Sequence, residues 1–216
     1  MQRLDEIAEQ IRQSFDQRTA ARDRALAQAR LLTRHCANAI RAAHRDEQEA
    51  VERHLAEARQ LVNALRSELA PFPDLYYAGY TQDALKEFAE AKLVYALLDK
   101  QPIPTPGELG LEDATYLQGL AEAVGELRRR CLDALLKRNC GEAERLLECM
   151  DDIYAVLVTI DYPDALTSGL RRLTDIARSI IERTRGDVTM SLQQERLERN
   201  LARLKQELED LSFDNG

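Results

Sequence analysis

The sequence contains no tryptophan, and only 5% of its 216 residues are aromatic, so any core must be mostly aliphatic. Glycine occurs 9 times and proline 6 times, and neither appears before Pro71. Both residues interrupt helices, so their scarcity in a chain dominated by Ala, Leu, Glu, Arg and Gln predicts helical structure. No segment has a convincing strand pattern. We therefore expect an all-α protein.

Other absences narrow the class of protein. No apolar run approaches the roughly 20 residues that cross a bilayer. The first residues, MQRLDEIAEQ, lack the apolar segment of a signal peptide, so we expect a cytoplasmic protein with no membrane partner. The four cysteines, Cys36, Cys131, Cys140 and Cys149, show no C-x-x-C spacing. We interpret them as reduced and mostly buried, which makes a zinc site unlikely.

The formal net charge of −8 disfavours a protein that binds nucleic acid over its whole outer surface. A local basic patch remains compatible with this charge. Candidate RNA-binding residues are Arg34, Arg41 and Arg45, which share much of one helix face, and Arg128 and Arg129. They either pair with the many acids or form a phosphate-binding wall inside an assembly.

Apolar periodicity predicts about seven helices, with a weaker stripe near residues 14–19 that leaves room for a kink. The expected ranges are 2–48, 51–69, 76–98, 113–138, 142–159, a helix capped by Asp161 that ends at Gly186, and a last helix through Leu211. We expect one α-helical domain over residues 1–216, a bundle of long antiparallel helices with a frayed tail at 212–216. Apolar seams at both ends of the chain favour an oligomer.

Two carboxylates interrupt the apolar pattern of residues 76–98. Glu87 and Glu90 are three residues apart, so they share a helix face beside an apolar stripe. Glu126 lies in a later helix, and Asp152 opens another apolar run. If these groups converge, their oxygen atoms suit Mg²⁺ or Mn²⁺. Otherwise they are surface acids in a chain that holds 38 acidic residues.

Related metal sites can be compared with this set. A ferritin-type di-iron site needs Glu-x-x-His on two helices, and none of the three histidines has that spacing, so we reject it. An all-α nucleotide pyrophosphohydrolase uses Glu-x-x-Glu and Glu-x-x-Asp motifs. Glu87/Glu90 and Glu148/Asp151 imitate that pattern, although far apart in sequence, so this class remains an alternative.

Several segments resemble the translin/Trax family. The segment YLQGLAEAVGELRRRCLDAL resembles the family's central helix, where Y-L-x-G-L-A-D-x-x-G-E-L-x-R is typical, and ALKEFAEAKLVYALL resembles the Trax Q-E-x-x-E-A segment. RLLTRHCANAIRAAHR resembles the N-terminal helix, and residues 150–189 fit the C-terminal half. The resemblance extends from about Ala21 over nearly the whole chain. It departs at Lys86, where the segment has Gln, and in lacking the basic clusters of animal translin.

The resemblance implies a seven-helix bundle that assembles into a closed octamer around a cavity. It also implies single-stranded RNA or DNA binding, as in translin, or Mg²⁺-dependent endoribonuclease activity, as in Trax. The Trax catalytic acids correspond to Glu87, Glu90 and Asp152, and Glu126 matches the G-E-L motif near the site. Because both glutamates are present, the chain is similar to the catalytic Trax type. It also resembles the prokaryotic, especially archaeal, members of the family, which would have to form a homo-oligomer. The expected function is cleavage of single-stranded RNA, or of RNA with single-stranded features. The alternative is a non-catalytic oligomer like translin.

Overall fold

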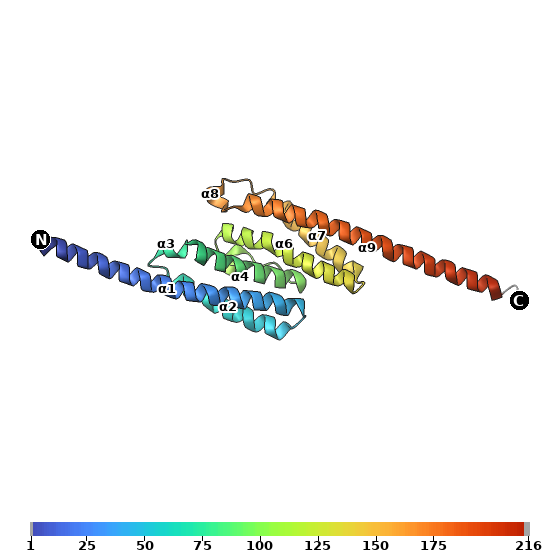
Figure 1. The fold of residues 1–216 in the computed structure, drawn as a ribbon, viewed down its shortest axis with the longest axis horizontal. Coiled ribbons are helices and arrows are strands. Elements are labelled where there is room, and N and C mark those ends of the chain that lie inside the picture. Colours follow the sequence, from blue (N-terminus) through green and yellow to red (C-terminus); the bar gives the residue numbers. More distant parts are fainter. Residues whose placement is uncertain (1, 214–216) are drawn as a thin grey trace. The chain divides into compact units, whose positions relative to one another are not determined.

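The structure is a computed structural model that describes the backbone of residues 2–213 and the side chains of residues 2–206. Within these residues it is all-α, with nine helices and no strand (Figure 1). Six helices are long, and three are single turns of four residues. The long helices are α1 (Gln2–His44), α2 (Gln48–Glu68), α4 (Gly79–Leu98), α6 (Asp113–Leu136), α7 (Cys140–Leu157) and α9 (Leu170–Phe213). The short ones are α3 (Pro73–Tyr76), α5 (Pro106–Leu109) and α8 (Asp164–Thr167).

The all-α class is confirmed, whereas some predicted helix boundaries are wrong. Helix α1 runs through residues 14–19 without a break, because good helix formers continue it where no apolar partner is needed. The predicted helix from Tyr76 begins only at Gly79, since Ala78 has extended backbone (φ −65, ψ 144). The predicted frayed tail lies mostly outside the described residues, and α9 includes Phe213.

The largest correction concerns residues 161–186. Pro163, not Asp161, is the N-cap of the short α8, and Gly186 does not end a helix. Helix α9 passes through Gly186 with nothing within 4 Å of the position a Cβ would take there. A single glycine costs a helix interior only about 1 kcal/mol relative to alanine. The surrounding turns outweigh that cost, so two predicted helices are one.

The chain divides into two compact units, which are described separately. The first comprises residues 1–123 and 162–171, and the second comprises residues 124–161 and 172–216. Helices α6 and α9 each begin in the first unit and continue into the second.

In the first unit, α1 and α2 form an antiparallel hairpin, and α4 packs against both of them (Figure 1). Phe88, Leu32, Leu65 and Leu93 are fully buried in its core. Arg59 on α2 joins three elements: its guanidinium lies 4.8 Å from the centroid of the Phe88 ring and donates a 2.6 Å hydrogen bond to the Leu109 carbonyl. Burial, the contact of Arg59 with the Phe88 ring and the hydrogen bond to Leu109 together hold α2, α4 and the α5 turn in place.

In the second unit, side-chain contacts connect α6, α7 and α9. Met150, Leu146 and Leu157 of α7 are buried. The Arg128 guanidinium of α6 lies 2.8 Å from both the Thr184 hydroxyl and the Asp187 carboxylate of α9.

Both long terminal helices expose apolar seams. The exposed side chains are Leu4, Ile7, Ile11 and Phe15 on α1, and Met190, Leu197, Leu201 and Leu204 on α9. Their exposed fractions run from 44% to 68%. Apolar residues at this helical spacing normally pack against another helix. The chain therefore carries the uncovered stripes that its sequence predicts.

Two other expectations can be compared with the described residues. No helix among them has the length and apolar character needed to cross a membrane. Cys36, Cys131 and Cys140 are buried and Cys149 is half-buried, all as free thiols. Burial raises the pKa of Cys131 to about 11, so that thiol stays protonated at neutral pH.

Replacement of Gly186 by alanine tests the continuity of α9. A helix interior with open space around the position favours alanine, so Gly186→Ala should raise the free energy of unfolding by up to about 1 kcal/mol. Chemical denaturation monitored by far-UV circular dichroism measures the change. Gly110→Ala is the contrasting control, because Gly110 has φ +68 and should lose stability. Loss of stability in Gly186→Ala would contradict a continuous α9.

Candidate metal centre

Helix α4 places two carboxylates at the edge of a buried face. Leu85, Phe88 and Ala89 are buried against the rest of the first unit. Glu87 and Glu90 lie on the adjoining face and are half-buried. The helix therefore positions these carboxylates between core and solvent, because it packs through the residues that flank them.

Gly119 brings α6 unusually close to α4. A Cβ at Gly119 would lie 2.6 Å from the Ala89 Cβ and 2.9 Å from both the Glu90 nitrogen and the Lys86 carbonyl oxygen. No other residue fits there without movement of backbone. Glu122 follows Gly119 by three residues, so it shares the face that meets α4. The glycine contact thus explains why a carboxylate of α6 reaches those of α4.

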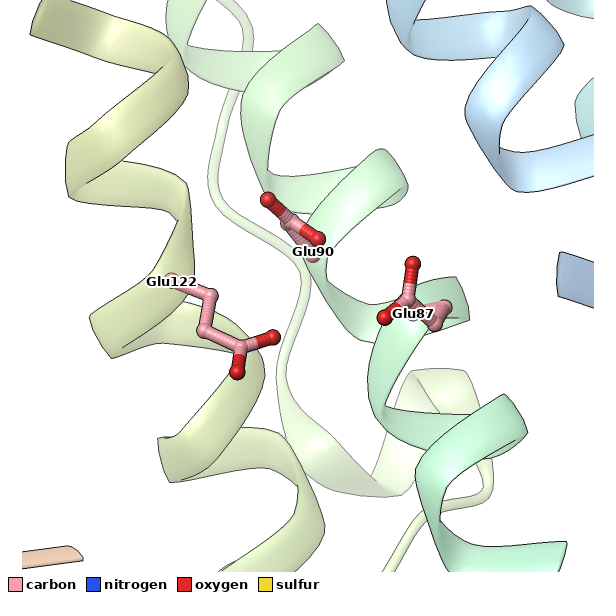
Figure 2. A group of neighbouring side chains, drawn as sticks. All are labelled: Glu87, Glu90 and Glu122. Carbon is pink, nitrogen blue, oxygen red and sulfur yellow. The ribbon is translucent and has the colours of Figure 1, made fainter. Parts of the chain in front are cut away.

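Glu87, Glu90 and Glu122 form a cluster. One carboxylate oxygen from each lies within 4.8 Å of those of the other two, and all three residues are half-buried. Figure 2 shows the side chains pointing toward one another, Glu87 and Glu90 from α4 and Glu122 from α6. The structure therefore brings together two predicted site residues and a third acid that the sequence had not singled out.

Lys86 lies beside the cluster. Its ammonium is 2.8 Å from Glu122 Oε1 and 3.9 Å from Glu87 Oε1. Burial alone would lower the pKa of Lys86, but the hydrogen bond to Glu122 and the charges of Glu122, Glu87 and Asp83 raise it overall. Lys86 is therefore charged at neutral pH, and the stability from its raised pKa is lost only in alkali, as pH rises through that pKa.

Glu87 has an unusual protonation equilibrium for a carboxyl group. Burial raises its pKa above the ordinary value, the Lys86 ammonium lowers it, and the carboxylates of Glu122 and Asp83 raise it further. The net shift is upward. Crowded, partly desolvated carboxylates resist ionisation unless a cation compensates their charge. The cluster therefore has the electrostatics of a cation-binding site.

The donor set fits a hard divalent cation. Three carboxylates supply only oxygen ligands, which Mg²⁺ and Mn²⁺ prefer, whereas zinc and copper favour nitrogen or sulfur. The partial exposure of the cluster leaves room for water ligands, which Mg²⁺ usually retains.

Two predicted metal ligands belong to the second unit. Asp152 is exposed on α7. Glu126 lies four residues after Glu122 on α6, with its carboxylate 3.6 Å from the Arg129 guanidinium. Since the two units are described separately, Asp152 and Glu126 stay predicted ligands.

The predicted RNA-binding arginines occupy different environments. Arg34 and Arg41 are exposed on α1, and Arg45 is exposed in the turn directly after it. Arg129 is exposed beside Glu126. Arg128 is more enclosed, since its guanidinium contacts Thr184 and Asp187. Exposed guanidinium groups can contact phosphate, so Arg34, Arg41 and Arg45 remain the best-placed candidates.

The sequence contains a pattern that includes Glu122 but does not select it over Glu126. In the segment YLQGLAEAVGEL it occupies the acidic position of the family pattern Y-L-x-G-L-A-D, three residues after Gly119. A glycine inside a long helix often marks a close helix contact. The later G-E-L motif of the family pattern favours Glu126 instead, and it too follows a glycine, Gly125. Only the structure distinguishes them, since Gly125 has nothing within 4 Å of its Cβ position.

Known proteins with similar sequence and structure were compared with the chain. No family model matches it. It is 35% identical over 188 residues to the uncharacterized protein MJ0175 of Methanocaldococcus jannaschii, covering 86% of this chain and 83% of that protein. The structure of AfC3PO in complex with duplex RNA matches with a TM-score of 0.78 and 32% identity, covering 85% of this chain and 95% of AfC3PO. Apo-NeC3PO has the same fold, with a TM-score of 0.79 at 20% identity, covering 85% of this chain and 96% of NeC3PO.

Substitution of Gly119 tests the helix contact that assembles the cluster. Gly119→Ala forces α4 and α6 apart and should lower the free energy of unfolding by about 1–3 kcal/mol, as overpacking does. Denaturant unfolding measures this loss. Gly125→Ala is the matched control on the same helix. It has open space and should be neutral or stabilising by up to about 1 kcal/mol. Equal stability of the two variants would contradict the close contact at Gly119.

Proposed function

The chain belongs to the translin/Trax family, and from this premise we propose that it is a Mg²⁺-dependent endoribonuclease of the Trax type. The observation that carries the proposal is the cluster of Glu87, Glu90 and Glu122. Like charges repel, so acids that converge across a helix contact need positive charge beside them. Lys86 supplies one such charge, and a bound divalent cation would supply more.

RNA is the proposed substrate. This chain matches 95% of AfC3PO at 32% identity, and the structure of AfC3PO is that of a complex with duplex RNA. We propose that the present chain binds single-stranded RNA, or RNA with single-stranded features, and possesses the same capacity for single-stranded DNA. Arg34, Arg41 and Arg45 would contact the backbone with little base preference, since guanidinium–phosphate contacts carry no sequence information.

Each residue of the cluster has a role in this proposal. Glu87 and Glu90 would hold the cation from α4, and Glu122 would hold it from α6. Asp152 is the proposed further ligand, and Glu126 is a proposed additional one. A bound Mg²⁺ would lower the pKa of a water molecule and stabilise charge on the scissile phosphate.

A homo-oligomer, expected to be an octamer, is the proposed assembly. Its support is the exposed apolar seams of α1 and α9, where side chains such as Phe15 (63%) and Leu197 (59%) have no partner in a single chain. A monomer with such stripes would expose apolar surface to water. We also propose that residues 1–216 act as a single translin-like domain, since the match to AfC3PO covers 85% of this chain and 95% of AfC3PO.

A second candidate function is favoured by one contact. The Lys86 ammonium, 2.8 Å from Glu122, already compensates part of the charge of the cluster. A cluster neutralised in this way suits a non-catalytic protein that binds single-stranded nucleic acid, as translin does. This candidate predicts RNA binding that needs no divalent cation and is unchanged in Glu90→Ala.

Cleavage of an RNA oligonucleotide tests the nuclease. The purified chain should cleave it with Mg²⁺ or Mn²⁺ and lose activity in EDTA. Glu87→Gln and Glu122→Gln should each reduce the rate at least about 100-fold, because each removes a ligand charge without changing side-chain shape. Asp152→Asn should do the same if α7 supplies the remaining ligand.

The matched control for these variants is Glu112→Gln, an acid outside the cluster whose carboxylate accepts a hydrogen bond from Tyr77. It should cleave like the parent protein. Full cleavage by the double variant Glu87→Ala, Asp152→Ala would overturn the proposal. Turnover of nucleoside triphosphates in place of RNA would instead identify a pyrophosphohydrolase.

Sedimentation tests the assembly. Sedimentation velocity should show an oligomer several times the 24.6 kDa mass of one chain. A double substitution in the α9 seam, Leu197→Glu with Leu204→Glu, places charge on the predicted contact and should shift the distribution toward smaller species. Arg196→Glu, on the same helix but outside the seam, is the control. A parent protein that sediments as a monomer at micromolar concentration would contradict the proposed assembly.

A further inference from the structure

Lys86 occupies an unusual position for a lysine. It comes from α4, yet its ammonium is 2.8 Å from a carboxylate of α6 and 3.9 Å from Glu87 of its own helix. Only 18% of its side chain is exposed, compared with 28% for Glu122 and 30% for Glu87. The Lys86 side chain is therefore more enclosed than those of its two acidic partners, and all three are less exposed than in an ordinary surface ion pair.

The position has an electrostatic reason. Three carboxylates with oxygens within 4.8 Å of one another repel strongly when they are partly desolvated. An internal cation offsets that repulsion and ties α4 to α6 at the turn where Gly119 brings them together. A lysine is well suited to a reversible role, because its ammonium is a compact charge on a flexible stem with three rotatable donors.

We propose that Lys86 is the internal counter-ion of the Glu87–Glu122 pair and that its ammonium leaves this position when a divalent cation binds. The inference rests on the proposed metal centre and adds how that centre is regulated. Two like-charged cations cannot share the same carboxylate oxygens without repulsion, so the ammonium and the divalent cation compete.

Two consequences follow from this competition. Without a divalent cation, Lys86 keeps the carboxylates of Glu87 and Glu122 in place, so the centre is preorganised and its charge is partly neutralised. With a divalent cation, displacement of the ammonium opposes binding, so Lys86 weakens metal affinity. An ordinary supporting hydrogen bond to a metal ligand would have the opposite effect, since such partners strengthen metal binding.

Calorimetric titration of the full chain with Mn²⁺, in the absence of RNA, tests the proposal. Lys86→Gln should bind Mn²⁺ about tenfold or more tightly than the parent protein, because the competing charge is gone. Lys86→Arg retains a cation and should keep the weaker affinity. Lys92→Gln is the matched control: it removes the same charge from the same helix at a half-buried position and should leave the affinity unchanged.

Thermal unfolding supplies a readout independent of metal affinity. In EDTA, Lys86→Gln should melt below the parent protein, because Glu87 and Glu122 then lose the ammonium that they share. Saturating Mn²⁺ should remove that difference, as the divalent cation replaces the lost charge. Lys86→Met, which has a similar shape and no charge, should repeat both effects and so separate charge from packing.

The outcomes distinguish this inference from the function beneath it. Mn²⁺ binding by the parent protein with equal or weaker binding by Lys86→Gln and Lys86→Met would overturn the role of Lys86 and leave the metal centre intact. Absence of Mn²⁺ binding in the parent protein and in both variants would overturn the metal centre, and the inference with it. RNA cleavage enters neither comparison.

Discussion

The contact between α4 and α6 at Gly119 is the constraint on which the candidate centre depends. The missing side chain at Gly119 allows the backbone of α6 to approach the Lys86 and Glu90 turn of α4 more closely than any Cβ would permit. Glu122 and Lys86 then meet across the contact at 2.8 Å. The close approach of α4 and α6 produces both the carboxylate cluster and the Lys86–Glu122 ion pair. An increase in helix separation of a few tenths of an ångström would therefore weaken both.

The close approach of α4 and α6 also has an electrostatic cost. Carboxylates crowded at a partly buried helix contact destabilise the fold unless positive charge compensates them, and the raised pKa of Glu87, caused first by burial, reflects that cost. Folds retain such features where they serve a site. The chain supplies one compensating charge of its own through Lys86, while the donor set favours a second from a divalent cation. If the proposed metal centre is correct, fold stability and metal binding depend on the same carboxylate groups.

Much of this protein could be predicted from the pattern of apolar residues and from the resemblance of its segments to a family. The all-α class, the end of α2 before Pro71 and the placement of Glu87 and Glu90 on one face all follow from local sequence patterns. Helix continuity through Gly186 could not be predicted in this way, because a glycine with open space around it has the same sequence signal as one that ends a helix.

Glu122 illustrates the other limit of prediction from sequence. Its selection over Glu126 depends on which glycine of α6 touches a neighbouring helix, a long-range property that no local pattern contains. Lys86 is a similar case: a lysine beside two glutamates usually indicates a solvated helix edge, and only the approach of α6 turns it into an enclosed counter-ion. Sequence can therefore identify the acids of one helix, whereas the partners that give them a function come from packing. The closest backbone contact between helices, and not the densest run of charge, shows where those partners lie.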